Sequence, residues 1–395
     1  MHIAMIGQKG MPAHYGGVER HVHDLSARLV KHGHAVTVYG RKWYTKTDKK
    51  TIDGVQLVHT PSIHTKHLDA ITGTFTATIH ALFSHFDIIH YHGVGPSLLS
   101  WIPRLFSPRT KVITTFHSID RYHQKWENFA KFFLRLGERT ACLFAHETIT
   151  ISQSLTQYCE NEYNKKTVYI PNGVTSKEIP TDTSTLKKYG LTKNNFIVMV
   201  SRLVPHKGAH VLIEAFHNLK ANNPQNTDIQ NLKLVIVGGT AYTDDYVKKL
   251  HIQASGVNDI IFTDFQSGEI LDQIYAHSKA LIHPSFAEGL PITVLQAMSF
   301  SRPVLLSAIP EHMELTDDIR IFFKTNDVDS LEKRLMEFLS MSTEKREEIG
   351  QKNKEVIIEK YTWQVLAQEV ITVYYKNLYT AHTKKHVQTL REIGA

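Results

Sequence analysis

The sequence predicts an α/β protein with two doubly wound, Rossmann-like domains that face each other across a cleft. The chain has 395 residues, which is too long for one ordinary hydrophobic core. Short apolar runs alternate with helical stretches, a pattern typical of parallel sheets covered by helices on both faces. The scheme runs through the first half and is repeated in the second. We therefore expect a first domain over 1–175, a second over 176–360, and a last helix with a tail over 361–395.

The first half begins with the compact apolar run HIAMI, which predicts a strand ending at Gly7. A helix is expected from about Gly17, because apolar residues recur along one face at spacings of four, three and four: Val18, Val22, Leu25 and Leu29. Further strands of this half are predicted at 35–39, 55–59, 87–91, 112–116 and 147–151.

The second half follows a polar connection over 175–195. A long amphipathic helix is predicted over about 361–379, and the polar tail after it is expected to fray. Ligands of doubly wound sheets bind beyond the carboxyl ends of the strands, so we expect the site in the cleft. Strands of this half are predicted at 196–201, 232–238, 259–263, 280–284 and 303–307.

The bulk composition suits a soluble globular protein, with 42% apolar and 21% charged residues. Cys142 and Cys159 are the only cysteines, which indicates a reducing compartment and no disulfide framework. No apolar run is long enough to cross a bilayer. The start, MHIAMIG, predicts a first strand and not a signal peptide. We expect a cytoplasmic protein.

The positive charge is concentrated in the first half. Residues 1–175 hold 20 Lys and Arg against 12 Asp and Glu, a net of +8, whereas residues 176–395 hold 25 against 26, a net of −1. A basic first half favours an anionic partner, such as membrane headgroups, nucleic acid or a phosphorylated acceptor.

The loop GQKGMPAHYGGVER follows the first strand and ends at the start of a helix. Glycines at 16 and 17 let the backbone approach a ligand, and the first N–H groups of the helix can bind an anion. The alternative is a plain turn with an N-cap. The G-x-G-x-x-G spacing of nicotinamide-cofactor sites is absent from this loop.

The segment SRLVPHKG follows the first strand of the second domain, and Arg202 and Lys207 bracket its loop. A guanidinium and an ammonium at one strand end can hold a diphosphate. The alternative is a pair of solvated surface cations.

The segment EGLPITVLQAM follows the strand predicted at 280–284. Gly289-Leu290-Pro291 is expected to begin a helix, because Pro suits a first helical turn, and free N–H groups there can hold a phosphate. Since a carboxylate would repel phosphate, Glu288 is expected to accept hydrogen bonds from sugar hydroxyls. Alternatively, Glu288 is only an acid favoured near a helix N-terminus.

These segments together resemble the retaining glycosyltransferases of family 4, which have the two-domain GT-B fold. The resemblance runs in order over nearly the whole chain, and IGQKGMPAHYGGVE is similar to the rhamnosyltransferase-like branch. The quoted motifs are GGVE (16–19), TFH (115–117), IPNGV (170–174), SRLVPHKG (201–208), EGLPITVLQAM (288–298) and a last helix that contains Trp.

The resemblance implies a nucleotide-sugar domain in the second half, an acceptor domain in the first, and a final helix that crosses back to the first domain. It implies no cofactor and no metal. The implied catalytic residues are His117, near the reacting end of the sugar; Arg202 and Lys207, on the diphosphate; and Glu288, on sugar hydroxyls. The implied donor or phosphate contacts are Gly16 and Gly17 (or the acceptor), Asn172, Gly289, Leu290 and Gln296.

Position 296 departs from the family, which has a second Glu there for the ribose hydroxyls. Gln keeps a carbonyl acceptor but loses the charge-assisted bond, so donor affinity is expected to fall by about 1 kcal/mol. The implied function is transfer of a sugar from a nucleotide diphosphate to an acceptor hydroxyl with retained configuration, in polysaccharide or glycolipid synthesis.

Three alternatives remain beside this interpretation. Gln296 motivates a degenerate relative that only binds. A GT-B-type nucleotide-sugar epimerase should show a different set of catalytic acids. A nucleic-acid binder, suggested by the pI near 9.1, would need exposed aromatics or a recognition helix, and the sequence shows no such motif. We expect no nucleic-acid partner.

Histidine pairs and basic aromatic stretches complete the candidates. His21 with His23, and His90 with His92, have a spacing that can bind zinc, but a structural role is favoured. The stretches 41–50 and 121–139 mix cations with aromatics. They predict either peripheral contact with an anionic membrane, which would fit a lipid-linked acceptor, or a core helix with a solvated basic face.

Overall fold

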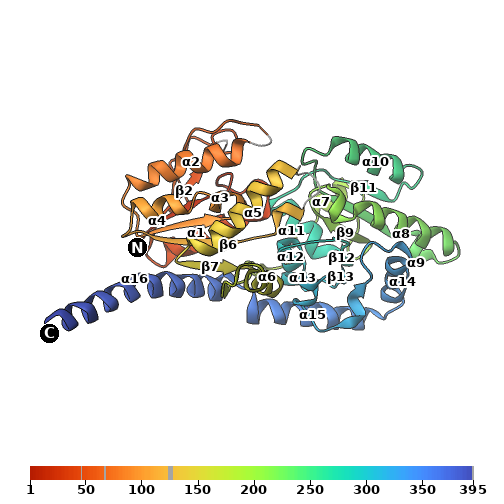
Figure 1. The fold of residues 1–395 in the computed structure, drawn as a ribbon. Coiled ribbons are helices and arrows are strands. Elements are labelled where there is room, and N and C mark those ends of the chain that lie inside the picture. Colours follow the sequence, from red (N-terminus) through yellow and green to blue (C-terminus); the bar gives the residue numbers. More distant parts are fainter. Residues whose placement is uncertain (46, 66–67, 123–127, 394–395) are drawn as a thin grey trace. The chain divides into compact units, whose positions relative to one another are not determined.

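The computed structural model describes residues 1–45, 47–65, 68–122 and 128–393. They form two compact units: Met1–Asn172 together with the segment from Trp363, and Gly173–Thr362. The chain passes from the first unit to the second between residues 172 and 173, and it returns to the first between 362 and 363. The boundaries expected from the sequence were 175/176 and 360/361. Each unit has its own sheet (Figure 1).

The first unit contains a sheet that, among the described residues, has eight strands in the order β3-β4-β2-β1-β5-β6-β7-β8. Only β3 and β4 pair antiparallel in this sheet as described. The strands are β1 (His2–Ile6), β2 (Ala35–Gly40), β3 (Thr51–Ile52), β4 (Val55–His59), β5 (Ile88–His92), β6 (Lys111–Phe116), β7 (Glu147–Thr150) and β8 (Val168–Tyr169).

Helices cover both faces of this sheet. The described helices are α1 (Gly17–Lys31), α2 (Leu68–Leu82), α3 (Val94–Ser97), α4 (Trp101–Phe106), the 3-10 turn η1 (Asp120–Tyr122), α5 (Asn128–Leu143), α6 (Gln153–Tyr163) and α16 (Trp363–Ile393).

Strand β1 shows how the two faces arise, because successive side chains of a strand point to opposite sides. Ile3 and Met5 belong to the hydrophobic cluster formed with α1 and α16. Ala4 and Ile6 belong to a second cluster that includes Ala77 of α2. The continuous apolar run HIAMI therefore marks a strand that is buried on both faces.

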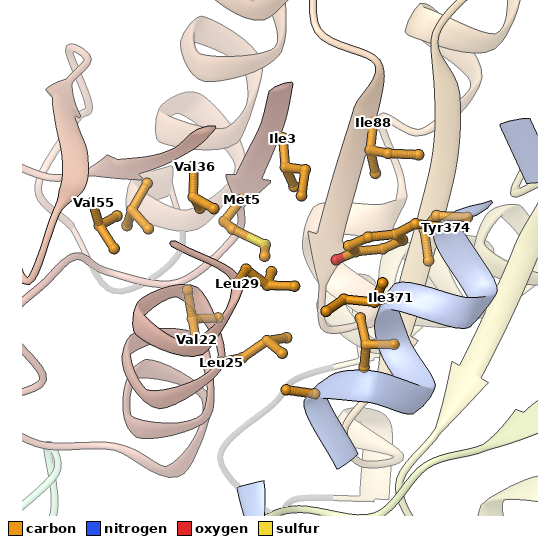
Figure 2. Packing of buried hydrophobic residues seen from close by; sticks show 14 of the residues in the cluster. Ile3, Met5, Val22, Leu25, Leu29, Val36, Val55, Ile88, Ile371 and Tyr374 are labelled. Atoms are coloured by element: carbon orange, nitrogen blue, oxygen red, sulfur yellow. The ribbon is translucent and has the colours of Figure 1, made fainter. Parts of the chain in front are cut away.

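The last helix, α16, is part of the first unit and packs on its sheet. Figure 2 shows Ile371 and Tyr374 of this helix in the same cluster as Leu25 and Ile88. The Tyr374 hydroxyl also lies 2.7 Å from Nδ1 of His90. The helix continues to Ile393, well past the end expected near 379.

The second unit has six strands in the order β11-β10-β9-β12-β13-β14, all parallel. In chain order this is 3-2-1-4-5-6, the doubly wound arrangement. Both units are therefore Rossmann-like α/β domains, as predicted. The strands are β9 (Phe196–Val200), β10 (Lys233–Val237), β11 (Ile260–Phe262), β12 (Ala280–His283), β13 (Val304–Ser307) and β14 (Phe322–Phe323).

The helices of the second unit alternate with its strands. They are α7 (Ser184–Lys188), η2 (Pro205–Lys207), α8 (Ala209–Asn222), α9 (Thr227–Gln230), α10 (Asp244–Ala254), α11 (Gly268–His277), α12 (Ile292–Ser299), α13 (Pro310–Met313), η3 (Ile319–Ile321), α14 (Val328–Leu339) and α15 (Thr343–Lys360).

Candidate functional site

Strands β9 and β12 mark the place where the strand order of the second unit reverses. The chain runs from β9 outward to β10 and β11, and then returns to place β12 on the other side of β9. Ligands of doubly wound sheets bind beyond the carboxyl ends of the strands at such a switch point. The loops 201–208 and 284–291 follow these two strands, so both predicted motifs of this unit start there.

Lys207 and Glu288 form an ion pair at this edge, with Nζ of Lys207 donating to Oε1 of Glu288. Nε2 of His283, the last residue of β12, lies 2.8 Å from the same oxygen. The side chains of Lys207, Glu288 and His283 are 13%, 8% and 1% exposed. The pair is thus largely shielded from water, which strengthens its electrostatic interaction.

The electrostatics of this group favour a charged carboxylate. Burial opposes the charge on Glu288, but the Lys207 ammonium and the hydrogen bond from His283 hold the pKa of Glu288 well below its usual range. Burial lowers the pKa of His283. At neutral pH the imidazole is therefore neutral, and its Nε2–H donates to the carboxylate.

Arg202 brings a second cation to the same place. It follows β9 and its side chain is exposed. Burial lowers the pKa of Lys207, with Glu288 opposing the shift and the positive charge of Arg202 adding to it. Two cations and a carboxylate therefore gather at the switch point of the second unit.

Gly208 allows the two loops to approach each other. Its φ is +73°, and a Cβ at this position would lie 2.1 Å from the carbonyl oxygen of Pro284. A side chain at 208 would push the loops apart. Glycine here keeps Lys207 next to Glu288.

The segment after Glu288 differs from the prediction in one respect. Helix α12 begins at Ile292, and Pro291 is its N-cap, with φ −77° and ψ 106°. The expectation that Gly289-Leu290-Pro291 begins the helix was wrong, because this extended backbone lies outside it. Gly289 and Leu290 are both buried in the loop before α12.

Gln296 is half-buried in α12. Its Oε1 lies 3.4 Å from the hydroxyl of Tyr275, on α11. This is a long contact, so the amide is only weakly held by its neighbour.

In the first unit, the loop after β1 leads to α1, with Gly16 as the N-cap at φ 105°. Glu19 turns back on this helix start: a Cβ on Gly16 would lie 1.9 Å from Oε2 of Glu19. Oε1 of Glu19 accepts from the backbone N–H of Lys9 at 3.1 Å. A buried carboxylate beside Gly16 and Gly17 disfavours an anionic ligand there.

His117 lies in a cluster of imidazoles that the sequence did not predict. Its Nε2 is 3.2 Å from Nδ1 of His92, at the end of β5. The ring centroids of His21, on α1, and His117 are 4.7 Å apart. Nδ1 of His21 lies 2.9 Å from Oδ1 of Asn172. His117 and Asn172, which the sequence analysis predicted as site residues, thus both contact His21.

Burial makes these rings neutral. It lowers the pKa of His21 to about 4, although the hydrogen bond with Asn172 opposes the shift. It also lowers the pKa of His92 and His117 well below the usual value, and neighbouring histidines add to the effect.

Of the two histidine pairs seen in the sequence, His21 and His23 separate in the fold, whereas the ring centroids of His90 and His92 lie 4.1 Å apart. His23, two residues after His21, lies 3.0 Å from Asp53. His90 contacts Tyr374 and Thr115 through its two ring nitrogens. The relevant group is instead His21, His92 and His117, one from each of three segments. Spacing along the chain carried no signal for it.

Two family models match consecutive parts of the chain. Residues 15–178 match "Glycosyltransferase Family 4", and residues 182–356 match "Glycosyl transferases group 1". The chain is 25% identical over 399 residues to an uncharacterized glycosyltransferase of Methanocaldococcus jannaschii, covering 95% of this chain and 98% of that protein. It is 26% identical over 306 residues to O-antigen chain mannosyltransferase C of Escherichia coli, covering 74% and 76%.

Solved structures show the same fold. Sucrose-phosphate synthase from Thermosynechococcus elongatus has a TM-score of 0.80 at 18% identity, covering 96% of this chain and 99% of that chain. Anabaena HepE, solved in complex with UDP and glucose, has a TM-score of 0.77 at 19% identity, covering 95% and 100%.

Two Rossmann-like units and these likenesses define a glycosyltransferase of GT-B type. The chain belongs to the GT-B glycosyltransferases, with a Glycosyltransferase Family 4 domain followed by a Glycosyl transferases group 1 domain. Within the described part of the chain, every helix is too short or too polar to span a membrane.

Proposed function

We propose that this glycosyltransferase moves a sugar from a nucleotide-diphosphate donor to an acceptor hydroxyl with retention of anomeric configuration, in polysaccharide or glycolipid synthesis. The observation that carries the proposal is the Lys207–Glu288 pair beside Arg202 at the β9/β12 switch point. Cations next to a carboxylate suit a ligand that joins a diphosphate to sugar hydroxyls. The E. coli mannosyltransferase and the UDP complex of HepE support a saccharide acceptor and a nucleotide donor.

The two cations serve the leaving group. Negative charge develops on the diphosphate as the sugar departs, and Arg202 and Lys207 stabilise it without needing a metal there. An ammonium has three donors, so Lys207 can hold Glu288 and diphosphate oxygens at once. Lys207 thereby links the phosphate end of the donor to the carboxylate that accepts from its sugar.

The first unit is assigned to the acceptor. The carboxylate of Glu19 beside Gly16 makes a phosphate contact unfavourable, and it suits acceptor hydroxyls instead. This selects the acceptor role from the two that the resemblance allows for Gly16 and Gly17. His117 is assigned to the reacting end of the sugar, and Asn172 acts on the same region through His21. The loop sequence before Gly16 favours the rhamnosyltransferase-like branch.

Gln296 is assigned to the ribose of the donor. The weak contact with Tyr275 leaves its amide able to accept from a ribose hydroxyl. Donor Kd measured for Gln296→Glu and Gln296→Ala tests this role. If neither substitution changes the Kd, the residue lies outside the nucleotide site.

The α5 helix supports a peripheral membrane site for a lipid-linked acceptor. Its Phe132 and Leu143 are 64% and 59% exposed, and Leu136 and Arg139 lie between them on one face at spacings of four, three and four. Mixed apolar and cationic side chains are typical of helices that lie on anionic membranes. The other side of α5 is buried, with Ala141 and Cys142 at 1% and 3% exposed, as the alternative of a core helix with a solvated basic face also expects. Lys125 and Trp126 of the same stretch lie outside the described residues.

The other basic stretch, 41–50, supports no membrane contact at its start. Arg41 donates to Asp69 at 2.8 Å, and Nε1 of Trp43 donates to the same carboxylate at 2.9 Å. Both side chains are thus hydrogen-bonded to Asp69 within the first unit.

A donor panel tests the proposal. Purified protein is incubated with UDP-, GDP- and ADP-sugars and lipid-linked saccharides, and product configuration is read by NMR. We expect one donor to give a product whose anomeric configuration matches that of the donor. Inverted product would overturn retention. Nucleotide binding without product from any acceptor would favour the binding-only alternative, and release of an epimerised sugar would favour an epimerase.

A further inference from the structure

Three histidines from separate segments of the first unit point ligand atoms toward one another. His21, His92 and His117 each offer one ring nitrogen, and these three atoms all lie within 4.8 Å of one another. The side chains are buried, and His117 is the least buried of the three, at 7% exposed. No Asp or Glu belongs to this group, so its three candidate ligand atoms are all nitrogens of neutral imidazole rings.

The separation of two of these nitrogens suits one small metal ion. Nδ1 of His92 and Nε2 of His117 are 3.2 Å apart. Two nitrogens bound to a tetrahedral zinc at 2.0–2.1 Å lie about 3.3 Å apart, which follows from the tetrahedral angle. His92 and His117 could therefore bind one zinc ion with almost no change in the distance between these two nitrogens.

The outer nitrogens of two rings are already oriented by the protein. Nδ1 of His21 faces the amide oxygen of Asn172 at 2.9 Å, so this nitrogen carries the proton and Nε2 keeps its lone pair. Nε2 of His92 lies 3.4 Å from the sulfur of Met5, a weak acceptor, which leaves Nδ1 toward the cluster. Metal-binding histidines donate their second N–H to an oxygen acceptor, and the amide oxygen of Asn172 is such a partner for His21.

We propose that His21, His92 and His117 bind a divalent transition-metal ion of the zinc type, with a fourth position left for water or an anion. Imidazole suits Zn²⁺, Cu²⁺, Ni²⁺ and Co²⁺, whereas Mg²⁺ and Ca²⁺ take oxygen ligands. The site goes beyond the proposed sugar transfer, although it shares His117, which is assigned above to the reacting end of the sugar; it involves neither Arg202 nor Lys207.

A second group, in the other unit, is a natural comparison. His283, Glu288 and His312 also place ligand atoms within 4.8 Å of one another. There, however, the ammonium of Lys207 already sits on the Glu288 carboxylate and would repel a metal cation. We expect this second group to stay without metal.

Zinc titration of the full chain tests the proposal. Protein freed of metal with a chelator is titrated with Zn²⁺ by calorimetry in the presence of a weak competitor, which masks loose surface sites. We expect one tight equivalent, and Co²⁺ should give the visible spectrum of a tetrahedral site. A wild-type chain with no saturable binding above the competitor would overturn the proposal, whatever the variants do.

Variants then locate the ion. His21→Gln and His92→Gln should abolish the tight equivalent, and Asn172→Ala should weaken it by roughly 10–100-fold through loss of the outer hydrogen bond. His312→Asn is the matched control, a buried histidine of the second group, and should bind as the wild type does. Tight binding retained in both His21→Gln and His92→Gln, or lost in His312→Asn alone, would contradict the assignment. Thermal unfolding confirms that each variant is folded.

Discussion

Lys207 and Glu288, 81 residues apart in the sequence, form a buried ion pair at the carboxyl edge of the second sheet. The pair exists because the loops after β9 and β12 meet across Gly208 and Pro284. It places the cation predicted for a diphosphate directly on the carboxylate predicted for sugar hydroxyls. The stability of this unit and the donor binding proposed above therefore involve the same two side chains.

Lys207→Met should destabilise the second unit by about 3–5 kcal/mol, because it leaves a buried carboxylate without its cation. Lys207→Met with Glu288→Gln should lose less than the sum of the two single changes. All four tryptophans, at 43, 101, 126 and 363, lie outside this unit, so fluorescence does not report on it. Hydrogen exchange of β9 and β12 amides is the measurement. Additive losses would show that the pair has no net coupling.

Acid should weaken the second unit through Glu288. The folded-state pKa of this carboxyl is lowered, so its contribution is complete above the ordinary value of 4.5 and is lost as pH falls from there toward the folded-state pKa. Glu288→Gln has no such proton to bind. Urea unfolding followed by circular dichroism should show a gap between wild type and variant that narrows below pH 4.5. Parallel curves through this range would count against the charged state of Glu288.

Arg202→Ala should weaken binding of the donor nucleotide by roughly 10- to 100-fold, the loss expected for one charge-assisted hydrogen bond. Titration calorimetry with UDP and GDP measures the change. Lys248→Ala is the matched control, because Lys248 belongs to the same unit and is 76% exposed. Equal affinities for wild type and Arg202→Ala would remove Arg202 from the diphosphate site.

Gly208→Ala should destabilise the second unit more than Gly256→Ala does. Both glycines have positive φ, +73° and +92°, so the backbone strain of roughly 1–3 kcal/mol is common to both changes. Only at 208 would the new Cβ meet backbone, 2.1 Å from the carbonyl oxygen of Pro284. Donor binding should also fall in Gly208→Ala alone. Similar stability for the two variants would show that the loops shift easily.

Phe132→Ser with Leu136→Ser should reduce co-sedimentation with anionic vesicles, because it removes apolar side chains that already lie in water. Phosphatidylglycerol vesicles are compared with phosphatidylcholine vesicles. Tyr242→Ser in the second unit is the control, since Tyr242 is 72% exposed but belongs to the half without excess positive charge. Recovery of the wild type in the supernatant with both lipids would exclude a membrane surface as the partner.

Local sequence patterns predicted most of the strands of both sheets. Runs such as HIAMI and FIVMV stand out because strands buried on both faces are continuously apolar. The two-residue strands β3, β8 and β14 were missed because so short a segment has no period to detect. The end of the last helix was misplaced because the polar residues after 379 gave no apolar stripe, although the helix continues to Ile393.

Sequence alone determined the repeated α/β scheme and the positions of Arg202, Lys207 and Glu288 at strand ends, since these depend on short-range pattern and composition. Only the tertiary structure decided which side chains touch. It joined Lys207 to Glu288 and turned Glu19 onto Gly16. It also gathered His21, His92 and His117 from three segments. Such contacts arise where parallel strands bring distant loops to one edge, and spacing along the chain does not encode that distance.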